Sequence, residues 1–151
     1  QKQIAARALV QFMVHPTTKN IYGTHIREYG SPNQEYAMLD IVPKALPALE
    51  ALPFKAIKKV EVVVPPHEWI GRMKHRLKNG DPDDIRNRLT EGVNNIEWAL
   101  DQGDDIAWLN NGGRRVEETA VDLIDIAQGQ HETNISARLV GEDLLATIKR
   151  L

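Results

Sequence analysis

The residues best placed to do chemistry are cations crowded into one short stretch of the chain. Between residues 68 and 78 the side chains that can carry positive charge are Arg72, Lys74, His75, Arg76 and Lys78. Such side chains on one helix can neutralise the phosphates of a nucleic acid. The formal net charge of the whole chain is −2, so attraction to nucleic acid has to come from a local patch. The stretch therefore predicts a phosphate-binding helix; the alternative is an ordinary solvated helix face.

A second pair of cations, Arg114 and Arg115, follows the turn sequence at residues 110–113 and opens a predicted helix. Backbone N–H groups at the start of a helix favour anions, so this pair predicts an additional anion contact. The alternative is that both arginines are ordinary loop charges.

Other kinds of chemistry find little support in the sequence. The chain has no cysteine, which excludes disulfides, thiolate metal sites and a thiol nucleophile. Its five histidines never occur as H-x-x-x-H, so a zinc site is not expected. P-loop, G-x-G-x-x-G and G-x-S-x-G motifs are absent. Trp69, Trp98 and Trp108 are expected to pack in the core or at its edge.

Helices are predicted where apolar residues recur at helical spacing. Residues 68–78 bury Trp69, Ile70, Met73 and Leu77 in this prediction. A longer helix follows, opened by Asp81-Pro82 as cap and first residue. In residues 116–127 the predicted core stripe is Ala120, Leu123, Ile124 and Ala127.

Strands are predicted from short apolar or alternating segments bounded by turn residues. The five segments are 8–14, 21–29, 35–42, 59–64 and 106–109. The first three predict an antiparallel meander, and the last two, each linked to helices, predict strands parallel to the first. The expected fold is therefore α/β, with a five-stranded mixed sheet and helices on both faces.

The stretch from residue 104 to 127 resembles the last strand, loop and helix of a ribonuclease HI domain. Trp108, the loop at 110–113 and Asp122 match that family in order, although the family's loop histidine is missing. By element order the resemblance covers residues 8–127 and implies a ribonuclease H-like fold. The predicted domain is 1–127, and residues 128–151 form a C-terminal extension with a strand at 134–140 and a short helix at 142–151.

The resemblance also implies a chemistry that the chain lacks the residues to perform. Ribonucleases of this family hold two magnesium ions with four carboxylates. Three of those positions fall near Val14, near Leu46 or Pro47, and near Pro65 or Pro66, so only Asp122 remains. We therefore expect no catalytic residue, no metal and no cofactor, with Asp122 as a remnant. The alternative is a relocated magnesium site built from other acids, namely Glu35, Asp40, Glu61, Glu68 and Asp125.

Three hypotheses for function follow. The first is a catalytically degenerate ribonuclease H-like domain that binds RNA, DNA or their hybrid, or acts as a scaffold in a larger nucleoprotein assembly. The second is a protein-interaction module, docking through residues 128–151 without nucleic-acid contact. The third is a magnesium-dependent nuclease with displaced carboxylates. The expected location is the cytoplasm, and no membrane partner is expected.

Overall fold

The computed structural model of this chain describes residues 9–14, 21–25, 39–51, 56–78, 81–130 and 134–151. Its contacts divide the chain into two compact units, Gln1–Ile57 and Lys58–Leu151. The sequence places a boundary between residues 127 and 128, whereas the contacts divide the chain between Ile57 and Lys58. Within the described residues, no helix combines the length and the apolar character that crossing a membrane requires.

The first unit contains a hairpin and a short helical segment. Strands β1 (Leu9–Val14) and β2 (Ile21–His25) pair antiparallel, with Met13 opposite Tyr22 and an irregular register between Leu9 and Gln11. The 3-10 helix η2 (Pro43–Ala45) leads into α2 (Leu46–Glu50). Pro47 lies in the first turn of α2, where a missing N–H costs no hydrogen bond.

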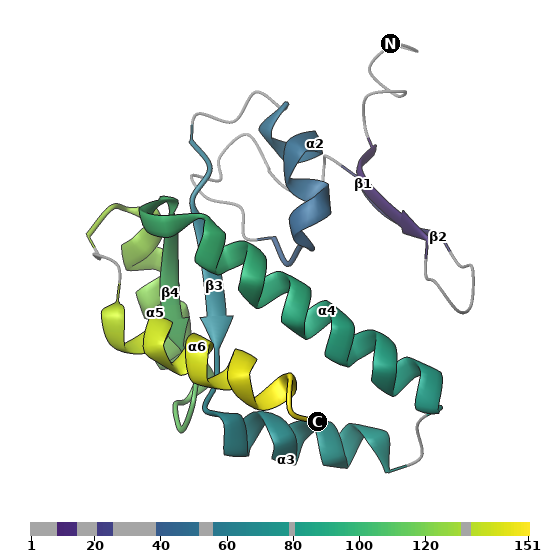
Figure 1. The fold of residues 1–151 in the computed structure, drawn as a ribbon. Helices are drawn as coiled ribbons and strands as arrows, with labels where there is room; N and C mark the ends of the chain where they lie inside the picture. The colour runs from purple at the N-terminus through teal and green to yellow at the C-terminus, as the bar shows by residue number, and fades with distance from the viewer. Residues whose placement is uncertain (1–8, 15–20, 26–38, 52–55, 79–80, 131–133) are drawn as a thin grey trace. The chain divides into compact units, whose positions relative to one another are not determined.

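The second unit alternates strands with helices (Figure 1). Strand β3 (Lys59–Val63) and strand β4 (Ile106–Asn110) pair in parallel, with Glu61 opposite Trp108. Parallel neighbours need a crossover connection, which α3 (Pro66–Leu77), α4 (Pro82–Asp101) and η3 (Gly103–Asp105) provide. After β4 come α5 (Val116–Ala127) and α6 (Ile135–Ile148).

Local sequence explains where these helices begin. Pro65-Pro66 ends the extended chain after β3, and Pro66 starts α3 at a position that tolerates proline. Asp81 caps α4, since its side chain accepts a hydrogen bond from the backbone N–H of Asp83 at 3.1 Å. The cap and helix that the sequence predicts here are confirmed.

The core of the second unit forms where β3 and β4 meet α4 and α6. Its buried members are Val63, Ile96, Ala99, Ile106, Trp108, Ala137, Leu144 and Ile148. Trp108 is 1% exposed, and Trp69 and Trp98 pack against this core while partly buried, so the structural role predicted for the tryptophans is confirmed. Residues 128–151 contribute to this core through α6.

The predicted five-stranded mixed sheet is wrong. The described residues form two separate two-stranded sheets, β1–β2 and β3–β4. Strands form in four of the predicted segments, 8–14, 21–29, 59–64 and 106–109, but their hydrogen bonds do not join them into one sheet. Residues 8 and 26–29 of these segments lie outside the described part. Of the predicted strand 35–42, residues 39–42 form no strand and lead into η2, and residues 35–38 lie outside the described part.

Two further predictions for the C-terminal half are corrected. Residues 135–148 form α6, so the strand predicted at 134–140 is wrong. Helix α5 forms where predicted but buries a different face, with Thr119 and Ile126 inside and Ala120 and Ile124 exposed. Thr119 can be buried because its hydroxyl donates to Asn111 Oδ1 at 2.6 Å, which satisfies the polar group.

Candidate functional site

The carboxyl ends of β3 and β4 lie together, and both strands continue from there into a helix. The backbone N–H of Asn111 donates to the carbonyl of Val63 at 2.8 Å, which holds the two strand–helix junctions side by side. A Cβ atom on Gly112 would lie 2.1 Å from Cδ of Pro65, so only glycine permits this approach. In parallel α/β sheets this edge is where ligands usually bind.

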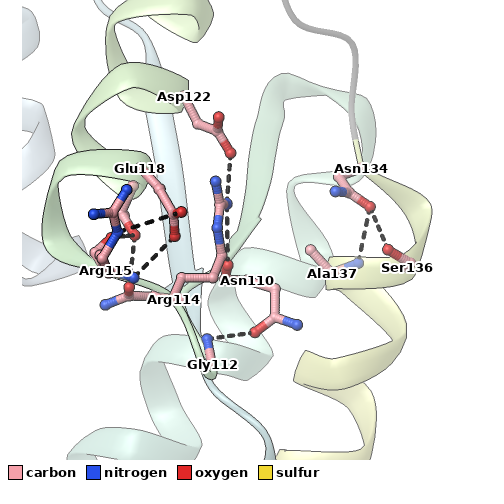
Figure 2. A network of polar contacts seen from close by, with 11 residues as sticks. Asn110, Gly112, Arg114, Arg115, Glu118, Asp122, Asn134, Ser136 and Ala137 are labelled. Atoms are coloured by element: carbon pink, nitrogen blue, oxygen red, sulfur yellow. Dashed lines mark hydrogen bonds and ion pairs between the residues drawn. The ribbon is translucent and has the colours of Figure 1, made fainter.

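The loop that follows β4 is organised by its own polar groups (Figure 2). The side chain of Asn110 accepts a hydrogen bond from the backbone N–H of Gly112 at 2.9 Å, which closes a tight turn. Gly113 then adopts a φ of 65°, a left-handed conformation that favours glycine. The sequence N-N-G-G therefore sets the direction in which Arg114 and Arg115 leave the sheet.

Both of these arginines face carboxylates of α5. Arg114 Nη1 donates to Asp122 Oδ2 at 2.6 Å (Figure 2). The guanidinium of Arg115 lies 3.6 Å from Glu118 Oε1, and its backbone N–H donates to Glu118 Oε2 at 3.0 Å. Contact with nucleic acid at Arg114 and Arg115 stays a prediction, and the nearby carboxylates of Asp122 and Glu118 weaken the attraction of this pair for phosphate.

Asp122, which the sequence predicts to be a catalytic remnant, is held by a cation. The hydrogen bond to Asp122, together with its negative charge, raises the pKa of Arg114, against a smaller opposing effect of burial. An arginine is already protonated throughout the range in which proteins fold, so the shift changes no charge. Among the residues the structure describes, no three histidine, aspartate or glutamate side chains are grouped to hold a metal ion. Glu35, named for a relocated site, lies outside the described residues.

The cations predicted on α3 differ in their surroundings. Arg72 Nη2 donates to Glu68 Oε2 at 3.3 Å, one turn away on the same helix. Lys74, His75 and Lys78 are exposed, and none of them forms an ion pair with a described residue. The side chain of Arg76 lies outside the described part, although its backbone belongs to α3.

The three exposed side chains form one stripe, because residues 71, 74, 75 and 78 recur at the spacing of a single helix face. The opposite face carries Trp69, which packs toward the core. Several other arginines form ion pairs with a carboxylate on their own helix. These pairs are Arg86 with Asp83, Arg88 with Asp84, and Arg138 with Glu142. The α3 stripe groups two lysines without a carboxylate partner on one helix face, whereas Lys58 and Arg150, which also lack one among the described residues, lie elsewhere in the chain.

A hollow of about 250 Å³ lies beside α3 near the carboxyl edge of the strands. It is lined by Val62, Val64, Trp69, Arg72, Met73 and Asn111. The structure thus brings together Arg72, which the sequence analysis named, and Asn111, which it missed as a lining residue. The signal that could have found Asn111 is its place directly after a buried strand of a parallel pair.

Searches against protein-family models, curated proteins and solved structures found no match to this chain.

Proposed function

We propose that Lys58–Leu151 is a non-catalytic nucleic-acid-binding unit that holds the phosphate backbone along α3. The observation that carries the proposal is the stripe of Lys74, His75 and Lys78, exposed and without a carboxylate partner among the described residues. Ammonium groups on a helix face bind phosphates as point charges and do not read bases. Binding by this stripe should therefore be weak and independent of sequence.

Arg72 lies between the stripe and the hollow, because it is one turn from His75 and also lines the hollow. Its partner Glu68 is on the same helix, and a pair of this kind on a surface contributes little free energy. A phosphate can therefore compete for Arg72 at small cost. Lys74 and Lys78 supply two contacts, and Arg72 supplies a third when Glu68 is displaced.

The number of contacts sets the salt dependence of binding. Each neutralised phosphate contributes about −0.9 to the slope of log affinity against log salt on a duplex, and about −0.7 on a single strand. Two or three contacts therefore predict a duplex slope of about −2 to −3. Titrations of single strand, duplex and hybrid at several salt concentrations measure it. Absence of saturable binding to all three at low salt would contradict the proposal.

Paired charge-removing variants locate the contact on the protein. Lys74→Gln with Lys78→Gln removes two phosphate contacts, each worth about −0.9 in the slope of log affinity against log salt. Relative to 1 M salt, the parent chain therefore gains about 1.8 log units more duplex affinity at 0.1 M than the variant does, so the variant should bind about 60-fold more weakly there. The matched control is Arg86→Gln with Arg150→Gln, which removes one exposed charge from α4 and one from the turn that follows α6. Equal losses in the two variants would mean that net charge, not the α3 stripe, governs binding.

A further inference from the structure

The outer face of α5 is apolar and open to solvent. Val116, Val121 and Ile124 are 73%, 56% and 42% exposed, and Ala120 between them is exposed too. The opposite side of the helix carries the buried Thr119 and Ile126. Scattered single apolar residues need no explanation, but three large ones on one face of one helix indicate a contact surface.

Negative charge lies within and beside this apolar face, because Glu117 falls between Ile124 and Val121 around the helix and Asp125 falls just beyond Val121. Helix α5 contains four carboxylates and no cation, and they are Glu117, Glu118, Asp122 and Asp125. Arg115 and Arg114 face two of them, Glu118 and Asp122. Glu117 and Asp125 form no ion pair with a described residue, and they lie one turn before and one turn after Val121.

The charge pattern selects among partners for this face. In a symmetric dimer with its axis at α5, Glu117 and Asp125 would meet the same acids of a second copy, which costs free energy. An anionic membrane surface would repel them in the same way. A partner helix with an apolar stripe and flanking lysines or arginines satisfies both features at once.

We propose that the outer face of α5, formed by Val116, Ala120, Val121 and Ile124 with Glu117 and Asp125, docks a basic amphipathic helix of another protein. The 12 residues of α5 span about 18 Å at 1.5 Å per residue, so about three turns of the partner can pack on it. An interface this small belongs with weak, transient complexes. The surface is separate from the α3 stripe and does not depend on it.

The probe is a fluorescent 18-residue peptide with leucine at i, i+3, i+4 and i+7 and lysine at the other positions, titrated with the full chain and followed by anisotropy. A matched peptide with glutamate in place of lysine tests the sign of the charge. The lysine peptide should bind saturably and lose affinity as salt rises. The glutamate peptide should not bind. Failure of the lysine peptide to bind at low salt, or equal binding of both peptides, would overturn the proposal.

Variants distinguish binding at the α5 face from nonspecific binding to exposed apolar residues. Val121→Gln with Ile124→Gln should weaken the lysine peptide about tenfold or more, because two apolar contacts are lost. Glu117→Gln with Asp125→Gln should weaken it at low salt and flatten its salt dependence. The control is Ile135→Gln with Leu139→Gln, which removes two exposed apolar side chains from α6 and should leave binding unchanged. An equal loss in this control would overturn the proposal.

Two other occupants are distinguished by sedimentation. If the full chain self-associates and Val121→Gln with Ile124→Gln makes it monomeric, the face is an interface between copies and the proposal is wrong. Co-sedimentation with vesicles of anionic lipid that the same variant abolishes would also overturn it. A monomeric chain that does not co-sediment with the vesicles but binds the lysine peptide supports the proposal. The helix signal of each variant in circular dichroism, matched to that of the parent chain, confirms that the fold is intact.

Discussion

Trp108 and Gly141 of the second unit are matched in size, a large side chain against a residue that has none. Trp108 is fully buried on β4, and Gly141 of α6 packs against its indole. A Cβ atom at Gly141 would lie 2.4 Å from Cζ3 of Trp108, much closer than carbon atoms can approach. The glycine therefore lets the backbone of α6 reach the largest side chain of the core, at the expense of helix propensity.

Gly141→Ala should destabilise the chain by up to about 2 kcal/mol, because overpacking costs about 1–3 kcal/mol and alanine regains only about 1 kcal/mol of helix propensity. Gly71→Ala makes the same change in α3, where nothing lies within 4 Å of the added Cβ, so it should stabilise by up to about 1 kcal/mol. Urea unfolding of both variants measures the two effects. Changes of the same sign would show that propensity, not contact with Trp108, decides the outcome at Gly141.

At the scale of the elements, sequence pattern located most helices and strands but misassigned α6. The buried stripe of α6 is Ala137, Gly141, Leu144 and Ile148, which has helical spacing but begins with two small residues. Its large apolar residues in the first turns, Ile135 and Leu139, are exposed. A prediction based on the large apolar residues therefore finds no helical pattern at 134–140, although the small residues do have helical spacing.

The start of α6 is fixed by Asn134. Its side-chain oxygen accepts hydrogen bonds from the backbone N–H of Ala137 at 3.2 Å and the hydroxyl of Ser136 at 2.6 Å (Figure 2). Asn134→Ala should cost about 1 kcal/mol, the usual loss for an N-cap. Ser136→Ala, at an exposed position whose hydroxyl bond satisfies no orphan backbone group, should stay within about 0.5 kcal/mol. Thermal melts of both variants test this, and equal losses of stability would show that the N-cap hydrogen bond of Asn134 does not stabilise α6.

The face of α5 was the other misassignment at this scale. Ala120 and Ile124 are apolar and have the spacing of a core stripe, so the pattern alone predicts that they are buried. The structure turns the helix so that Thr119 reaches the amide oxygen of Asn111 in the loop before it. A hydrogen bond that spans eight residues depends on the shape of that loop, which no periodicity in the helix reveals.

At the scale of the whole molecule, the order of elements was a poor guide to how strands pair. Four of the five predicted strand segments exist, yet β1–β2 and β3–β4 are separate sheets. Pairing depends on contacts far apart in sequence, which local pattern does not encode. The cations of α3 were found from sequence because a helix face follows from spacing alone. The pairing of Arg114 with Asp122 was not found, because it joins a loop to a helix eight residues later.

The core of Lys58–Leu151 draws on both ends of that unit, and this leads to a prediction about fragments. Val63 enters from β3, Ile96 and Ala99 from α4, and Ala137, Leu144 and Ile148 from α6. Because these residues bury one continuous cluster around Trp108, residues 58–151 should fold without residues 1–57. Residues 58–127, which end at the boundary suggested by the sequence, should not fold, since removing α6 takes Ala137, Leu144 and Ile148 out of the core and uncovers Trp108.

Thermal unfolding of the two fragments, followed by circular dichroism and tryptophan emission, tests this. Residues 58–151 should melt in one cooperative transition with emission typical of a buried indole. Residues 58–127 should show no cooperative transition and red-shifted emission, because the loss of several large core contacts exceeds the 5–15 kcal/mol or so of stability usual for a domain. A matched fragment of residues 58–148, which keeps all of α6 and removes only Lys149, Arg150 and Leu151, controls for truncation itself. If residues 58–127 melt as cooperatively as residues 58–151, α6 is not part of the folding core.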